Sequence, residues 1–201
     1  MADLKQFTKD ALRTESTVES IELNGDVLKS ILEIFIASGN LLDMAKKNAF
    51  YNKKVNDFDY VKRMKEIENA MSNIQTDGEK DYITYYSRLT DNKSELIVNP
   101  RLFHGIVGIA TEATEMVEAL IPAMNGEEVD WVNVAEEMGD ISWYEAILFD
   151  EIKLDWDVCL DTVISKLKVR FPECYTDDKA INRNLNEERK VLEEELGKVG
   201  C

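Results

Sequence analysis

Two pairs of acidic residues constrain the fold of this chain more than any other feature of its sequence. They are Glu112 with Glu115, and Glu137 with Asp140. Residues three apart on a helix lie on one face, so the two side chains of each pair point the same way. Apolar residues flank the pairs on those faces: Ile109, Met116 and Ala119 beside the first, and Val134, Ile141 and Tyr144 beside the second. The acids therefore belong to helix faces that other helices have to cover.

The residue types of this cluster indicate a hard metal ion. Four carboxylates that face a helical interior repel one another unless a cation lies between them. Ligands that are all oxygen suit Mg²⁺ or Mn²⁺. His104 is the single histidine, so the paired Glu-x-x-His pattern of di-iron bundles cannot be built. The sequence therefore predicts a Mg²⁺ site, with Mn²⁺ as the other suitable ion, in an enzyme that acts on a phosphate substrate.

The composition favours an all-α fold with one compact domain or two small ones. The chain has 201 residues, 44% of them hydrophobic, and its few prolines and glycines lie mostly between periodic segments. A short helix is expected within residues 1–24, and residues 173–186 are expected to be irregular. Residues 79–99, with Tyr82, Ile83, Tyr85 and Tyr86, fit either a helix or a strand. Caps and turns predict the remaining helices at about 26–50, 57–74, 100–121, 130–152, 155–170 and 187–197. The apolar face of the first of these is expected to comprise Leu28, Ile31, Leu32, Phe35, Leu42 and Ala45.

The formal net charge of −16 argues against one class of partner. A surface with this charge repels nucleic acid, and no basic stripe offsets it. Residues 1–15 hold no apolar signal segment, and no apolar run approaches the length of a membrane span. The cysteines, Cys159, Cys174 and Cys201, are odd in number and lack metal-ligand spacing, which is typical of reduced thiols. These features predict a cytoplasmic protein without nucleic-acid or membrane partners.

A weak internal similarity divides the chain into two halves, residues 1–98 and 99–201. The segments that align are 37–45 with 112–120, and 59–69 with 130–140. Three of the four acids are replaced in the first half, by Ala37, Asn40 and Asn69. The first half would then be a degenerate repeat that packs on the catalytic helices of the second. The alternative is that two amphipathic hairpins match by chance.

Four blocks of the second half resemble the MazG-like all-α nucleoside triphosphate pyrophosphohydrolases, a group related to the dimeric dUTPases. The order of the acids is the same, with an ExxE pair followed about twenty residues later by an ExxD pair. The blocks are residues 104–120, 129–144, 166–172 and 180–189. One departure is Thr114, where many members carry glycine. The N-terminal half resembles the family only loosely.

This resemblance implies a fold, a reaction and an assembly. The fold is like a four-helix bundle, and the four acids bind Mg²⁺ and carry the catalysis. The reaction cleaves a nucleoside triphosphate, ribo or deoxyribo, between its α- and β-phosphates and gives a monophosphate and pyrophosphate, for nucleotide-pool control or house-cleaning. The assembly implied is a homodimer. A catalytically weak nucleotide-binding or regulatory protein on the same fold is the alternative, whereas a purely structural bundle leaves the acids unexplained.

Cations in the C-terminal region are candidates for phosphate binding. Lys166 and Arg170 have i, i+4 spacing and can share a helix face, from which they would hold the outer phosphates of the substrate. The alternative is that they only make the surface soluble. Asn182 and Arg183 follow in a tail that could close over the substrate.

Two aromatic residues are candidates for contact with the base or sugar. His104 could line the nucleotide pocket, or it could be a core or capping residue. Trp143 could stack on a base, although tryptophans at helical spacing are more often part of a core.

Asp150 follows an apolar run, and its carboxylate could form hydrogen bonds that support the metal ligands.

Overall fold

The structure is a computed structural model in which residues 3–77 and 84–197 are described. It is all-α, as predicted: most of the described residues lie in helices, and the strands are only two or three residues long. No helix in the described part of the chain is long and apolar enough to cross a membrane. The chain divides into two compact units, which are described separately below.

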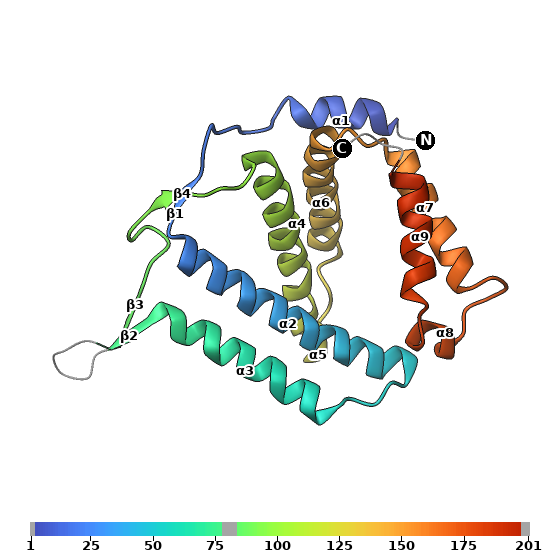
Figure 1. The fold of residues 1–201 in the computed structure, drawn as a ribbon, viewed down its shortest axis with the longest axis horizontal. Helices are drawn as coiled ribbons and strands as arrows, with labels where there is room; N and C mark the ends of the chain where they lie inside the picture. Colours follow the sequence, from blue (N-terminus) through green and yellow to red (C-terminus); the bar gives the residue numbers. More distant parts are fainter. Residues whose placement is uncertain (1–2, 78–83, 198–201) are drawn as a thin grey trace. The chain divides into compact units, whose positions relative to one another are not determined.

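The first unit contains the predicted acid-bearing helices. It comprises Met1–Ser20, Val98–Pro172 and Asn184–Cys201. This unit takes in the N-terminal helix as well, whereas residues 173–183 belong to the other unit, so the two units differ from the expected halves 1–98 and 99–201. Its helices, drawn in Figure 1, are α1 (Leu4–Leu12), α4 (Pro100–Glu118), α5 (Leu120–Met124), α6 (Trp131–Glu151), α7 (Trp156–Arg170) and α9 (Leu185–Leu196).

Side-chain caps fix the beginnings of the two central helices. The Asn99 side chain accepts hydrogen bonds from the backbone of Arg101 and Leu102, at 2.8 and 3.1 Å, and Pro100 occupies the first turn of α4. Asp130 caps α6 in the same way. The first of these helices ends at Glu118, earlier than expected, and the short helix α5 follows, with Pro122 inside it.

Helices α4 and α6 lie side by side and run antiparallel (Figure 1). The Asn99 side chain donates a hydrogen bond to Glu151, at 2.6 Å, where α4 begins and α6 ends. Further along, Gly105 faces Leu148 and Gly108 faces Tyr144. Because a Cβ atom at either glycine would lie within 2.6 Å of those side chains, the two helices approach more closely than larger residues would allow.

Trp143 and Arg170 connect further helices of this unit. The Trp143 indole donates to the carbonyl oxygen of Ala11, at 3.1 Å, and to the Thr14 hydroxyl, at 2.9 Å, which attaches α6 to the end of α1. Helix α9 packs on α7, where Arg170 forms two hydrogen bonds with the buried carboxylate of Glu188. The predicted helix at 187–197 is therefore present, beginning two residues earlier.

The second unit comprises Ile21–Ile97 and Glu173–Arg183. Its main feature is an antiparallel pair of helices, α2 and α3, and two short antiparallel strand pairs flank the helices. Strand β1 pairs with β4, and β2 with β3. The elements are β1 (Glu22–Leu23), α2 (Gly25–Tyr51), α3 (Asp57–Ile74), β2 (Gln75–Asp77), β3 (Thr84–Tyr86), β4 (Ser94–Glu95) and α8 (Asp177–Ile181).

Several local predictions for this unit need correction. The cap of α2 is Asn24, which accepts a hydrogen bond from the backbone of Val27, so the helix begins before Asp26. Residues 84–86 form a strand, which resolves part of the ambiguous segment, while Tyr82 and Ile83 lie outside the described residues. The segment expected to be irregular contains α8, because the Thr176 side chain caps it.

The predicted apolar face of α2 is also not the face that is buried. The residues of α2 that are buried are Val27, Ser30 and Ala37. By contrast, five of the six residues of the predicted face are exposed, namely Ile31, Leu32, Phe35, Leu42 and Ala45. Small side chains explain the difference, because Ser30 and Ala37 of α2 and Ala70 of α3 leave room for two helix backbones to approach closely.

Candidate functional site

The α4–α6 pair brings acids from both predicted pairs together. Glu112 from α4 meets Glu137 and Asp140 from α6, and one carboxylate oxygen of each lies within 4.8 Å of the others. Glu137 is the innermost of the three, with 4% of its surface exposed, whereas Asp140 is exposed. The group is therefore closed on the side of Glu137 and open to solvent on the side of Asp140.

The fourth predicted acid, Glu115, lies one turn further along α4 and is exposed. It is outside the group of three, but its negative charge acts on Glu137 and on Tyr144. The four acids singled out in the sequence thus share one electrostatic environment, and three of them are close enough to share a ligand.

The electrostatics of this group centre on Glu137. Burial raises the pKa of its carboxyl group to about 7, and a hydrogen bond with Glu112 and the negative charges of Glu115, Glu112 and Asp140 act in the same direction. At neutral pH a proton therefore remains on a substantial fraction of Glu137. That proton relieves the repulsion among the carboxylates, which is the effect that a bound cation would also have.

The donor set fits a hard divalent ion. Oxygens around Mg²⁺ lie about 2.1 Å from the ion, so opposite ligands are about 4.2 Å apart. The three carboxylate oxygens, within 4.8 Å of one another, need only small side-chain movements to close around such an ion. Their position on two tightly packed helices keeps them in place before any ion binds.

Tyr144 adjoins the acid group and was not assigned a functional role from the sequence. Its ring packs over Gly108, one helical turn from Glu112, and lies one turn from Asp140 on its own helix. Burial raises the pKa of the Tyr144 hydroxyl, and the charges of Glu112, Asp140 and Glu115 add to this effect. Its i+4 spacing from Asp140 is the only sequence signal that could have indicated this position.

The predicted base-pocket residues His104 and Trp143 form an aromatic cluster with Tyr144. The three rings meet edge to face, with centroids 4.9 to 5.9 Å apart. The indole N–H of Trp143 is already bonded to Ala11 and Thr14. What the structure shows for Trp143 is a packing role, and contact with a base stays a prediction for both residues.

None of the predicted phosphate-binding residues is a member of the acid group. Arg170 is engaged with Glu188, and its side chain is only 15% exposed. Lys166, one turn earlier on α7, is half-buried and forms no ion pair with any residue that the structure describes. Asn182 and Arg183 belong to the second unit, where Asn182 donates a hydrogen bond to Asp178 at 2.7 Å.

A charge cluster that the sequence did not reveal closes the far end of the α4–α6 pair. Arg101 bonds Glu15 through two nitrogens, at 2.7 and 2.9 Å, and both Asp150 and Glu151 at 2.8 Å. Burial alone would raise the pKa of Asp150, but the Arg101 hydrogen bond and the charges of Lys153 and Arg101 outweigh it, so the pKa is lowered. Asp150 therefore accepts hydrogen bonds from Arg101 and Lys153 and does not support the metal ligands.

Comparisons of the chain with models of known protein families, with curated proteins and with solved structures gave no match. The functional argument therefore rests on the geometry of the acid group and on the sequence blocks described above.

Proposed function

We propose that this chain is a divalent-metal-dependent nucleoside triphosphate pyrophosphohydrolase, which converts a ribo- or deoxyribonucleoside triphosphate into the monophosphate and pyrophosphate. The observation that carries the proposal is the buried Glu137, hydrogen-bonded to Glu112 and within 4.8 Å of Asp140. Burying a carboxyl group among other acids costs folding free energy, and such groups are concentrated at functional sites. The resemblance of four sequence blocks to the MazG-like enzymes supports the reaction.

Each acid has a distinct part in this proposal. Glu112, Glu137 and Asp140 hold the ion, with Mg²⁺ favoured over Mn²⁺. The ion, when bound, neutralises phosphate oxygens and lowers the pKa of a water molecule. Glu115 lies outside the group of three, so its carboxylate remains free to accept a proton from the attacking water. Lys166, which has no ion-pair partner in the described residues, is the better remaining candidate for contact with the outer phosphates.

One observation favours a second candidate function. Arg170, the predicted bidentate phosphate ligand, is already held by Glu188. A site with fewer cations stabilises the charge that develops during phosphoryl cleavage less well. The chain would then bind nucleotides without turning them over quickly, as a regulatory protein on the same fold. Pairing of two chains into a homodimer is compatible with either function.

Product analysis separates the two functions. The purified chain is incubated with Mg²⁺ and each standard ribo- and deoxyribonucleoside triphosphate, as well as dUTP, and pyrophosphate and orthophosphate are measured. We expect equal amounts of monophosphate and pyrophosphate from at least one nucleotide, and no products in EDTA. Tight nucleotide binding without products supports the regulatory function. Full turnover in metal-free buffer contradicts the proposed metal site.

A further inference from the structure

A cavity lies at the C-terminal end of α6, beside α1 and the start of α7. Its volume is about 360 Å³, within the usual range for small-molecule sites. Asp140 and Asp150 are ten residues apart on α6, so the cavity begins about 15 Å along the helix from the acids. All of its lining belongs to the first unit, and comprises Lys5, Thr8, Lys9, Leu12, Phe149, Asp150, Lys153, Leu154, Asp155 and Trp156.

Two stacked aromatic rings form a rigid part of this lining. The rings of Phe149 and Trp156 lie with their centroids 4.0 Å apart and their planes tilted by 32°. The Trp156 indole donates to the Thr8 hydroxyl at 2.9 Å, and that hydroxyl donates to the carbonyl oxygen of Leu4 at 2.9 Å. This chain of hydrogen bonds holds the indole in one orientation at the edge of the cavity, where Trp156 and Phe149 are both lining residues.

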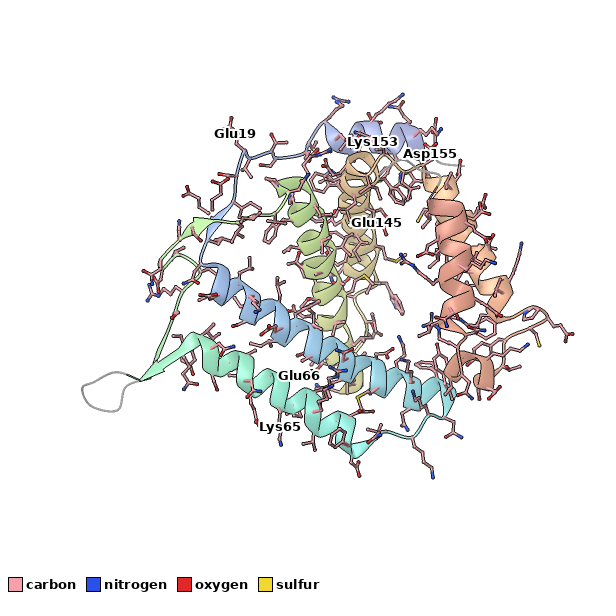
Figure 2. All side chains as sticks on the ribbon, viewed as in Figure 1. Glu19, Lys65, Glu66, Glu145, Lys153 and Asp155 are labelled. Carbon is pink, nitrogen blue, oxygen red and sulfur yellow. The ribbon has the colours of Figure 1, made fainter. Side chains whose placement is uncertain are left out.

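Three lysines belong to the same lining as the two rings. Lys5 lies 3.4 Å from Asp155, in an exposed pair of the kind that contributes little to stability. Lys153, which is itself exposed, lies 3.4 Å from the half-buried Asp150. Figure 2 labels Lys153 and Asp155 near α1 and the start of α7. Lys9, the third lysine of the lining, forms no ion pair within the described residues.

The acids of the lining do not cancel this positive charge. Asp150 is already bonded through its other oxygen to Arg101, at 2.8 Å. Asp155 is exposed and has only its weak pair with Lys5. Three lysines against two aspartates leave the lining with one net positive charge, in a chain whose formal net charge is −16.

We propose that this cavity binds a planar anion, namely an aromatic or heteroaromatic ring that carries a phosphate or carboxylate group. The ring packs against Trp156 and Phe149, and the anionic group replaces the aspartates as the partner of the lysines. A ring without charge, or a phosphate without a ring, makes only half of these contacts. The site uses none of the four predicted metal ligands, so it does not depend on the proposed hydrolase function.

Calorimetric titration in EDTA tests this proposal while any metal-dependent binding at the acid group is switched off. The probes are AMP and indole-3-carboxylate as planar anions, adenosine as the ring alone, and inorganic phosphate as the anion alone. We expect at least one planar anion to bind at least about tenfold more tightly than adenosine or phosphate, with affinity that falls as salt is added. A preference for AMP or for indole-3-carboxylate shows which combination of ring and anionic group fits the cavity better.

Substitutions of exposed lysines locate the binding without endangering the fold. Lys9→Ala and Lys153→Ala should each weaken binding of the preferred planar anion at least about threefold, and together about tenfold. Lys65→Ala, on α3 in the second unit, is the matched control and should leave the affinity unchanged. The proposal is overturned if no planar anion binds better than adenosine and phosphate, or if all three variants bind equally well.

Discussion

Gly108 of α4 faces the ring of Tyr144 on α6 so closely that a Cβ atom at Gly108 would lie 2.2 Å from two of the ring carbons. No real Cβ atom approaches a ring to that distance, so any larger residue at this position has to push the two helices apart. The contact lies one helical turn from Glu112, and it therefore also governs the spacing of the acid group.

We predict that Gly108→Ala destabilises the protein. Overpacking of this kind costs about 1 to 3 kcal/mol, which outweighs the helix propensity gained by replacing glycine. Thermal unfolding followed by circular dichroism measures the effect. Gly139→Ala on α6 is the matched control, because a Cβ atom there meets nothing within 4 Å. It should leave the stability unchanged or raise it by up to about 1 kcal/mol, and equal melting temperatures for both variants would contradict the close packing.

The stability of the metal-free protein should fall as the pH rises through the range in which Glu137 titrates. The pKa of Glu137 is raised from 4.5 to about 7 in the folded protein, so the folded state holds this proton more tightly than the unfolded state. Its stabilising contribution is complete below about pH 4.5 and is lost as the pH rises to 7 and beyond. Urea unfolding in EDTA at several pH values measures this loss, which should be absent from Glu137→Gln. Parallel curves for the two proteins would show that Glu137 titrates normally.

Turnover should depend on each acid of the group. Changing Glu112, Glu137 or Asp140 to alanine should lower turnover at least about a hundredfold, as expected when a group in direct contact with the reacting atoms is lost. Glu115→Ala should have an effect of the same size if Glu115 accepts the proton from water. Glu118→Ala is the control, since Glu118 is an exposed acid of the same helix outside the group. Near-normal rates for both Glu115→Ala and Glu137→Ala would rule out the assignment.

Arg170 and Lys166 should respond differently to substitution. Arg170→Ala removes two hydrogen bonds to the buried carboxylate of Glu188, which should lower the melting temperature. Lys166→Ala should leave the melting temperature nearly unchanged and weaken triphosphate binding more than monophosphate binding. Thermal unfolding and nucleotide titration of both variants distinguish the roles. If Arg170→Ala keeps its stability and loses triphosphate affinity, Arg170 acts on the substrate after all.

Local signals in the sequence were enough to predict the main helices of the first unit. Asn99 with Pro100, and Asp130, act within one turn of the helices that they begin, so their effect can be read from a few neighbouring residues. Helix α8 was missed because its capping residue, Thr176, lies in a segment too short and polar to show helical periodicity.

Contacts between distant residues could not be predicted in this way. Arg101 and Glu15 are 86 positions apart, and nothing in either segment indicates that they meet. The i, i+3 spacing placed the two acid pairs on common faces, but it could not show that Glu137 would be buried while Glu115 remained exposed. That distinction depends on how α4 and α6 rotate against each other, which the glycines and aromatic residues of both helices decide together.

The register of α4 against α6 sets the distances between the carboxylates of the acid group. Sliding one helix by a single turn would shift its residues by about 5.4 Å, which is enough to move Glu112 out of reach of Asp140. The residues that prevent such a slip are Asn99 with Glu151 at one end of the pair and Gly108 with Tyr144 near its middle. The distance between the carboxylates is thus determined by residues that would not contact a bound ion. A mutation in this packing could therefore change which ion fits without altering any ligand.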